Sequence, residues 1–177
     1  MIRVAFIRGV GGGIRPLPMA QLRSRLEEAG FAKVRSYIAS GNLLFDAPPR
    51  ATARTLSRRI AACIAEHFGF EPLVVVQTLA ELERAVERNP YPAADAAPTS
   101  LHLFFLDAPA KAARFDEMDR LKSATEQYRL DEQKFYLYTP DGFGVSKLAE
   151  RVDRLLGVPA TARNWRTIHT MIELAKA

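Results

Sequence analysis

The stretch RGVGGGIRPLPM, residues 8–19, combines cations and glycines between an apolar run and a helix-like stretch. Backbone N–H groups at glycines can point at a ligand, and a helix N-terminus favours negative charge. The stretch lacks the Lys-Ser or Lys-Thr pair of the GxxxxGK[ST] phosphate loop and the last glycine of the GxGxxG dinucleotide fingerprint. The stretch is therefore neither of these two phosphate-binding loops, and we expect a different kind of anion site. The alternative is a strand-to-helix connection in which the glycines serve only the backbone geometry. The residues concerned are Arg8, Gly9, Gly11, Gly12, Gly13 and Arg15.

The stretch TARNWRTIHTM, residues 161–171, places polar residues where we expect the last helix to start, near Arg163. A positive charge at a helix N-terminus opposes the helix dipole, so Arg163 implies an acidic partner. That partner is either a ligand, with Asn164 and Thr167 nearby, or a carboxylate that braces the fold. Trp165 has the helical spacing of a core residue, and we expect it to be a buried packing anchor.

The stretch PDGFGVSKL, residues 140–148, is the third candidate, with Ser146 as an expected helix N-cap and Lys147 in the first helical turn. The competing interpretation is a well-formed turn before a capped helix.

Other arrangements that carry chemistry are missing from the sequence. The three histidines, His67, His102 and His169, are far apart and lie in no HExxH or CxxC context, so we expect no metal and no cofactor. The single cysteine, Cys63, excludes a disulfide within the chain and is expected to be buried. Residues 42–45 read NLLF and lack the aromatic RNA-recognition signature, which leaves nucleic-acid binding as a weak alternative. Whether the protein is an enzyme stays open.

These candidates must be positioned by elements that the apolar periodicity predicts. The first half is expected to run strand, helix, hairpin, helix, strand, at residues 2–7, 18–29, 31–39 with 42–45, 56–68 and 72–78. This is the ferredoxin-like order, in which two helices cover one antiparallel sheet.

The second half nearly repeats that order. A possible capping box at Thr78 and Glu81 starts a connecting helix through Glu87, and prolines then mark a boundary. The sequence predicts a strand, helix, hairpin, helix and final helix at residues 101–106, 110–121, 127–130 with 135–138, 146–156 and from about 163. The fold class is therefore α+β, with two ferredoxin-like-related halves of the βαββαβ type, mainly antiparallel sheets covered by helices, and a C-terminal helix. The predicted halves are residues 1–89 and 90–177, as two domains or as one compact domain.

Composition fits an ordinary globular protein that can bury a core. The chain has 177 residues, of which 48% are hydrophobic and 25% are charged, and its formal net charge of +5 favours anionic partners in a general way. No apolar run reaches about 18 residues, and the N-terminus lacks a signal-peptide core, so we expect a cytoplasmic protein without a membrane.

Three stretches together resemble a known bacterial family: FIRGVGGGIRPLPMAQLRSRLEEAGFAKVRSYIASGNLLF, PDGFGVSKLAERVDRLLG and ATARNWRTIHTMIEL. The family is the domain-of-unknown-function family 1697. The resemblance runs from residue 2 to the C-terminus and implies the same two-part architecture without a function. Family members commonly read R-G-I/V-N-V-G-G before the helix, whereas this chain is one residue shorter there and lacks the asparagine. The resemblance also adds Ser40 and Asn42 to the candidate residues.

The leading hypothesis is binding, with or without turnover, of a small anionic or phosphorylated ligand between the two halves. The alternatives are a non-enzymatic structural or protein-interaction module and a weak nucleic-acid binder. The candidate ligand contacts are Arg8, Gly9, Gly11, Gly12, Gly13, Arg15, Ser40, Asn42, Ser146, Lys147, Arg163, Asn164 and Thr167.

Overall fold

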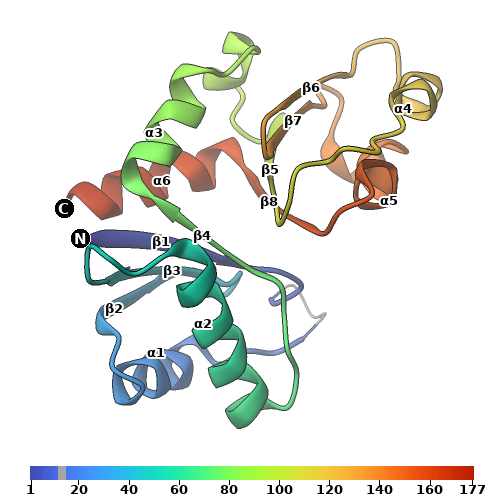
Figure 1. The fold of residues 1–177 in the computed structure, drawn as a ribbon. Coiled ribbons are helices and arrows are strands. Elements are labelled where there is room, and N and C mark those ends of the chain that lie inside the picture. Colours follow the sequence, from blue (N-terminus) through green and yellow to red (C-terminus); the bar gives the residue numbers. More distant parts are fainter. Residues whose placement is uncertain (12–14) are drawn as a thin grey trace. The chain divides into compact units, whose positions relative to one another are not determined.

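The computed structural model describes residues 1–11 and 15–177 (Figure 1). Two of the candidate residues, Gly12 and Gly13, lie outside the described residues. The chain divides into two compact units, which we call unit 1 (Met1–Arg84 with Thr170–Ala177) and unit 2 (Ala85–His169). The division therefore falls inside two helices, α3 (Leu79–Glu87) and α6 (Trp165–Lys176). Whether residues 1–89 and 90–177 form separate domains stays a prediction.

Unit 1 contains the predicted βαββαβ series. Its elements are β1 (Ile2–Ile7), α1 (Met19–Glu28), β2 (Ala32–Tyr37), β3 (Asn42–Asp46), α2 (Ala53–Phe68) and β4 (Val74–Thr78). The strands form one antiparallel sheet in the order β2-β3-β1-β4, and α1 and α2 cover one face of it (Figure 1).

The core of unit 1 follows from the apolar alternation of its strands and the apolar stripes of its helices. Ala5 and Ile7 share a face of β1 with Leu43 of β3 and Val76 of β4, and all four are buried. Burial of this surface supplies the main driving force for folding, at about 25 cal/mol per Å². The predicted capping box is confirmed: the N–H of Thr78 donates to Oε2 of Glu81 at 2.7 Å, and the N–H of Glu81 donates to Oγ1 of Thr78 at 3.1 Å.

Unit 2 has the same element order. Its elements are the 3₁₀ turn η1 (Pro92–Asp95), β5 (Leu101–Leu106), α4 (Phe115–Leu121), β6 (Gln127–Asp131), β7 (Lys134–Tyr138), the 3₁₀ turns η2 (Phe143–Val145) and η3 (Ala149–Arg151), α5 (Val152–Leu156) and β8 (Ala160–Asn164). Its sheet is antiparallel in the order β6-β7-β5-β8, which corresponds strand by strand to the sheet of unit 1. The predicted α+β class with two related halves and a C-terminal helix is thus confirmed.

Three predicted helices of the second half have different bounds. The last helix, α6, begins at Trp165, two residues after Arg163, and residues 160–164 before it form β8, which pairs along β5. The helix expected over 146–156 is reduced to the 3₁₀ turn η3 and α5, and the helix expected over 110–121 begins only at Phe115. At residues 160–164, pairing with the distant strand β5 overrides the local pattern.

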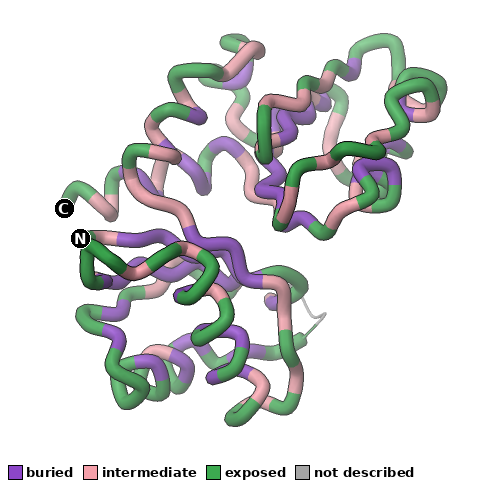
Figure 2. Tube along the Cα trace, viewed as in Figure 1, coloured by how far each residue is buried: buried purple, intermediate pink, exposed green. Residues whose placement is uncertain are grey.

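Burial follows the strands and the inward helix faces (Figure 2). Trp165 is fully buried and its Nε1–H donates to Oδ1 of Asp95 at 3.0 Å, which confirms the predicted packing anchor. Cys63 is buried as predicted, and burial raises the pKa of its thiol. Within the described residues, no helix is long and apolar enough to cross a membrane.

Candidate functional site

The glycine-rich stretch starts where β1 ends, between two neighbouring segments of unit 1. The N–H of Ile7 donates to the carbonyl oxygen of Gly41 in the β2–β3 turn at 2.8 Å. The next amide, that of Arg8, donates to the carbonyl oxygen of Leu73, just before β4, at 2.9 Å. The backbone is therefore fixed on both sides at the point where the loop leaves the sheet.

Two glycines are required by close packing of the loop against the hairpin turn. A Cβ on Gly11 would lie 2.2 Å from the carbonyl oxygen of Ala39, and a Cβ on Gly41 would lie 2.4 Å from Cγ2 of Val10. Both residues also have positive φ, 79° and 74°, which disfavours any side chain. Gly11 and Gly41 are therefore explained by backbone geometry and close packing, without a ligand.

Gly9 differs because nothing lies within 4 Å of its Cβ position, although its φ is 69°. Arg8 and Val10 do not have positive φ, so the sign of φ alternates from Arg8 to Gly11. Such alternation is typical of backbone nests, in which successive N–H groups converge on an anion. The N–H groups of Gly9 and Val10 have no hydrogen-bond partner among residues 1–11 and 15–177.

Positive charge surrounds these two amides. The side chains of Arg8 and Arg15 are exposed, and the guanidinium of Arg15 lies 5.0 Å above the centre of the Phe70 ring, a cation–π contact. The N–H of Gly11 donates to the carbonyl oxygen of Arg15 at 3.2 Å, which brings Arg15 back to the start of the loop. The following helix, α1, has Pro18 at its N-cap, no side-chain cap and no acidic residue in its first turn.

The two candidate residues of the β2–β3 hairpin, Ser40 and Asn42, lie in different surroundings. Asn42 is fully buried, and its Nδ2 donates to the carbonyl oxygen of Tyr37 at 3.2 Å, so it holds the hairpin together. Ser40 lies in the turn itself, half-buried, one residue from the contact between Gly11 and Ala39.

Arg163 of unit 2 lies in β8 rather than at a helix start, so the dipole argument for an acidic partner is wrong. Its Nη1 donates to Oγ1 of Thr161 at 3.0 Å and to the carbonyl oxygen of Ala162 at 2.7 Å. Burial lowers the pKa of Arg163 to about 10. Hydrogen bonds from the guanidinium to Thr161 and Ala162 of the same strand support the bracing interpretation.

The remaining candidates of unit 2 complete local structure. Oδ1 of Asn164 accepts from the N–H of Thr167 at 2.9 Å and so caps α6. Oγ of Ser146 accepts from the N–H of Ala149 at 3.0 Å at the start of η3, which keeps the predicted capping role with a 3₁₀ turn in place of a helix. Lys147 lies exposed in the turn between η2 and η3 and not in a helical turn.

His102 is a residue of unit 2 that the sequence did not single out as a site. It lies on β5 opposite Asn164 of β8, and its ring stacks on that of Phe143 with centroids 3.7 Å apart. Its Nδ1 is buried with no hydrogen-bond partner in the part of the chain that the structure describes, and burial lowers the pKa of His102 to about 4. The only sequence signal is one polar residue inside the apolar run LHLFFL.

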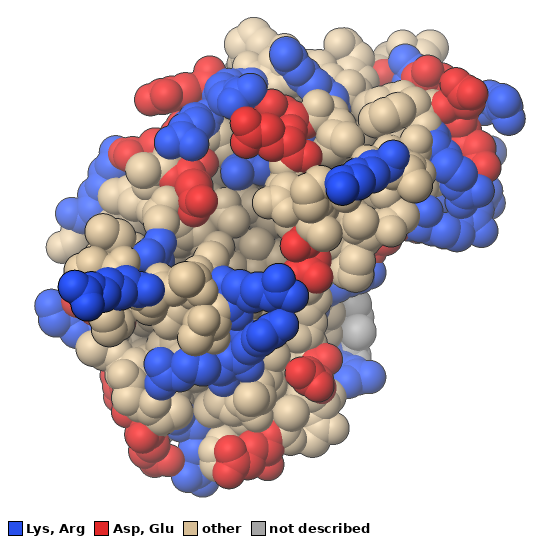
Figure 3. Space-filling view, in the orientation of Figure 1, with Lys and Arg blue, Asp and Glu red and all other residues tan. Residues whose placement is uncertain are grey.

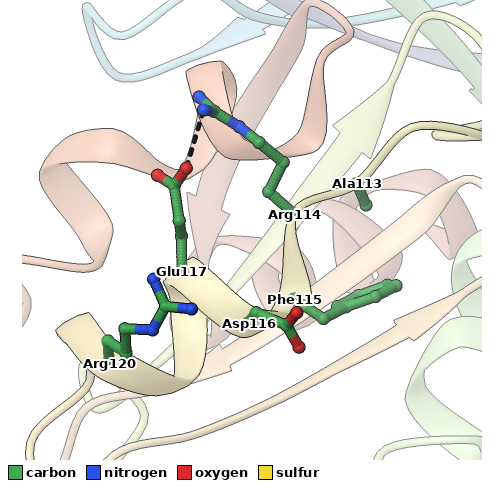
Figure 4. Close-up of a pocket in the computed structure, with 6 residues that line it drawn as sticks. All are labelled: Ala113, Arg114, Phe115, Asp116, Glu117 and Arg120. Atoms are coloured by element: carbon green, nitrogen blue, oxygen red, sulfur yellow. Dashed lines mark hydrogen bonds and ion pairs between the residues drawn. The ribbon is translucent and has the colours of Figure 1, made fainter.

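A cavity of about 520 Å³ in unit 2 lies at the start of α4 (Figure 4). Its charges neutralise one another: Arg114 and Glu117 point toward each other, and their Nη1 and Oε1 atoms are 2.8 Å apart. None of the predicted site residues lines it. The lining residues are Ala113, Arg114, Phe115, Asp116, Glu117 and Arg120. Nowhere in residues 1–11 and 15–177 do three His, Cys, Asp or Glu side chains gather as a metal site.

Two sheets with one strand order, each with its helices, define an α+β protein built from two related halves. The chain belongs to the family described as "Protein of unknown function (DUF1697)", whose model matches residues 1–136. The match includes the glycine-rich stretch and ends before the stretches at 140–148 and 161–171.

Among solved structures, the chain is similar to the conserved bacterial protein SP0830 from Streptococcus pneumoniae. The TM-score is 0.75 at 20% sequence identity, over 99% of this chain and 98% of the other. At this identity the likeness shows the fold. No curated protein matches the chain.

Proposed function

We propose that this protein binds a small anionic, phosphorylated ligand in unit 1, through the N–H groups of Gly9 and Val10 with Arg8 and Arg15 beside them. The observation that carries the proposal is the pair of consecutive amides without a partner among the described residues, in a backbone whose φ changes sign at each residue.

Phosphate oxygens fit this arrangement chemically. An ionised acceptor makes hydrogen bonds roughly twice as strong as a neutral one, and it can accept from two adjacent amides at once. The planar guanidinium of arginine binds phosphate through two parallel hydrogen bonds. Because α1 begins with neither an acidic residue nor a side-chain cap, its N-terminus adds to the positive potential of unit 1.

Thermal unfolding with increasing inorganic phosphate, sugar phosphates and nucleotides tests the proposal. A ligand at about 100 times its Kd should stabilise the folded state by about 2.7 kcal/mol. Arg8→Gln and Arg15→Gln should each reduce that stabilisation, whereas Arg84→Gln, which removes an exposed arginine of α3 in the same unit, should not. Failure of every phosphorylated compound at millimolar concentration, or equal losses for all three variants, would overturn the proposal.

The second candidate function is a structural or protein-interaction module. It is favoured by the tight packing of Gly11 and Gly41 and by the use of Ser146, Arg163 and Asn164 in local hydrogen bonds. Under this function the melting temperature stays constant with phosphate while substitution of the packed glycines lowers it.

A further inference from the structure

The net positive charge of the chain belongs to unit 1. Unit 1 has 13 Lys and Arg residues against 8 Asp and Glu residues, whereas unit 2 has 12 of each. Within unit 1, residues 47–65 contain four arginines and no acidic residue, and most of them belong to α2. Basic side chains gather over α2 in the space-filling view (Figure 3).

Three of these arginines, Arg50, Arg54 and Arg58, form what we call the basic face. All three are exposed, and none has a hydrogen bond or ion pair within the described residues. The fourth, Arg59, is used by the fold, because its Nη2 donates to the carbonyl oxygen of Ala29 at 2.6 Å and its guanidinium lies 4.6 Å above the centre of the Phe31 ring.

The basic face works against the stability of its own helix. Arg54 lies in the first turn of α2, where a cation opposes the helix dipole. Arg54 and Arg58 are four residues apart, so they are like-charged neighbours on the helix surface. No acidic residue stands in the first turn to offset either effect. An anion bound from outside the helix would offset both effects.

We infer that the basic face of α2 binds the phosphate backbone of a nucleic acid. Residues four apart on a helix rise by about 6 Å, which presents the guanidiniums of Arg54 and Arg58 in a row that can follow successive phosphates. Arginine is suited to this role because its planar fork binds phosphate oxygens in pairs. The inference does not depend on the proposed loop site, which shares none of these residues.

An acidic protein fits the face less well. Protein interfaces depend on buried aromatic or aliphatic anchors, whereas the exposed large hydrophobic residues of the described chain, Met1, Ile38, Phe115 and Val145, are all absent from α2. The lack of an aromatic side chain on the face also removes a platform for base stacking. Binding should therefore occur through phosphates without sequence preference.

Fluorescence anisotropy tests the inference. Labelled duplexes of about 20 base pairs, two of DNA with different sequences and one of RNA, are titrated with the protein at salt concentrations from about 50 to 200 mM. The protein should bind both DNA sequences equally, with affinity that falls as salt rises. Arg54→Gln with Arg58→Gln should weaken binding at low salt by about tenfold or more and reduce the slope of log K against log[salt] by about 2, since each phosphate contact contributes about 0.9.

The matched control is Arg151→Gln with Arg154→Gln, which removes two exposed arginines of unit 2 and gives the same net charge. This variant should bind like the parent. Equal weakening by both double variants would overturn the inference, since general charge would then explain the binding. Tighter binding to polyglutamate or to phosphatidylserine vesicles than to the duplexes would overturn it as well, as would failure to bind any duplex at about 50 mM salt. Circular dichroism confirms that each variant is folded.

Discussion

His102 is a side chain whose ionisation the fold opposes. Its Nδ1 is buried without a partner among the residues that the structure describes, and Phe143 stacks on the ring. A proton on this nitrogen would create a buried positive charge and an N–H donor without an acceptor, and both cost free energy. Desolvation by burial therefore lowers the pKa of His102 to about 4, from the usual histidine value of 6.5.

This pKa predicts a loss of stability in mild acid. The unfolded chain takes up a proton at His102 near pH 6.5 and the folded protein only near pH 4, so the contribution of His102 is complete above pH 6.5 and disappears as the pH falls to 4. A shift of this size corresponds to on the order of 3 kcal/mol. Urea unfolding of His102→Phe, which keeps a ring against Phe143, should show a stability profile between pH 7 and pH 4 that is flatter by about that amount.

His67→Gln provides the comparison, because it removes a more exposed histidine of unit 1 and should leave the acid profile of the parent unchanged. If His102→Phe loses as much stability in acid as the parent, His102 is not the group responsible.

At the scale of single residues, packing roles could be predicted from sequence better than site roles. Trp165 and Cys63 stand at helical spacing among apolar residues, and that local pattern was enough to predict their burial. The requirement for Gly11 depends on the carbonyl oxygen of Ala39, a residue 28 positions away in the sequence that no local pattern relates to Gly11. The anion-site hypothesis for Gly9 stays a prediction.

At the scale of elements, β8 shows why the strands of unit 1 were predicted better than those of unit 2. The strands of unit 1 carry continuous apolar runs such as VAFI and LVVV, which identify them locally. The strand ATARN is held in place by its pairing with β5, with Ala160, Ala162 and Asn164 on one face and Thr161 and Arg163 on the other. Small and polar residues in alternation give no hydrophobic period, so only the partner strand defines this element.

The charge distribution of α2 predicts that the helix can be stabilised. Arg54→Gln with Arg58→Gln removes one cation from the first turn and one like-charged pair, and glutamine is a good helix former. Urea unfolding should show a gain of about 0.5 to 1 kcal/mol in the free energy of unfolding at low salt, and a smaller gain at high salt.

Arg59→Gln is the contrasting variant in the same helix. Because Arg59 donates to the carbonyl oxygen of Ala29 and covers the Phe31 ring, its loss should destabilise the protein. A drop in stability for the double variant Arg54→Gln with Arg58→Gln would mean that these arginines support the fold.

At the scale of the whole molecule, the two units share a topology and differ in charge. The excess of Lys and Arg, the alternating backbone at Gly9 and the basic face of α2 all belong to unit 1, while unit 2 has equal numbers of both signs. Membership of the DUF1697 family and the likeness to the streptococcal protein show the fold. Function has to be sought in sites, because one fold can host many functions.

The most direct measurement of the central claim is an NMR titration of the ¹⁵N-labelled protein with inorganic phosphate. The account predicts that the amide resonances of Gly9 and Val10 shift most and saturate together, and that Arg8→Gln weakens the saturation. Largest shifts on α2 would assign the phosphate to the basic face instead. Saturable binding that leaves the Gly9 and Val10 amides unmoved would contradict the claim that these amides form the anion site.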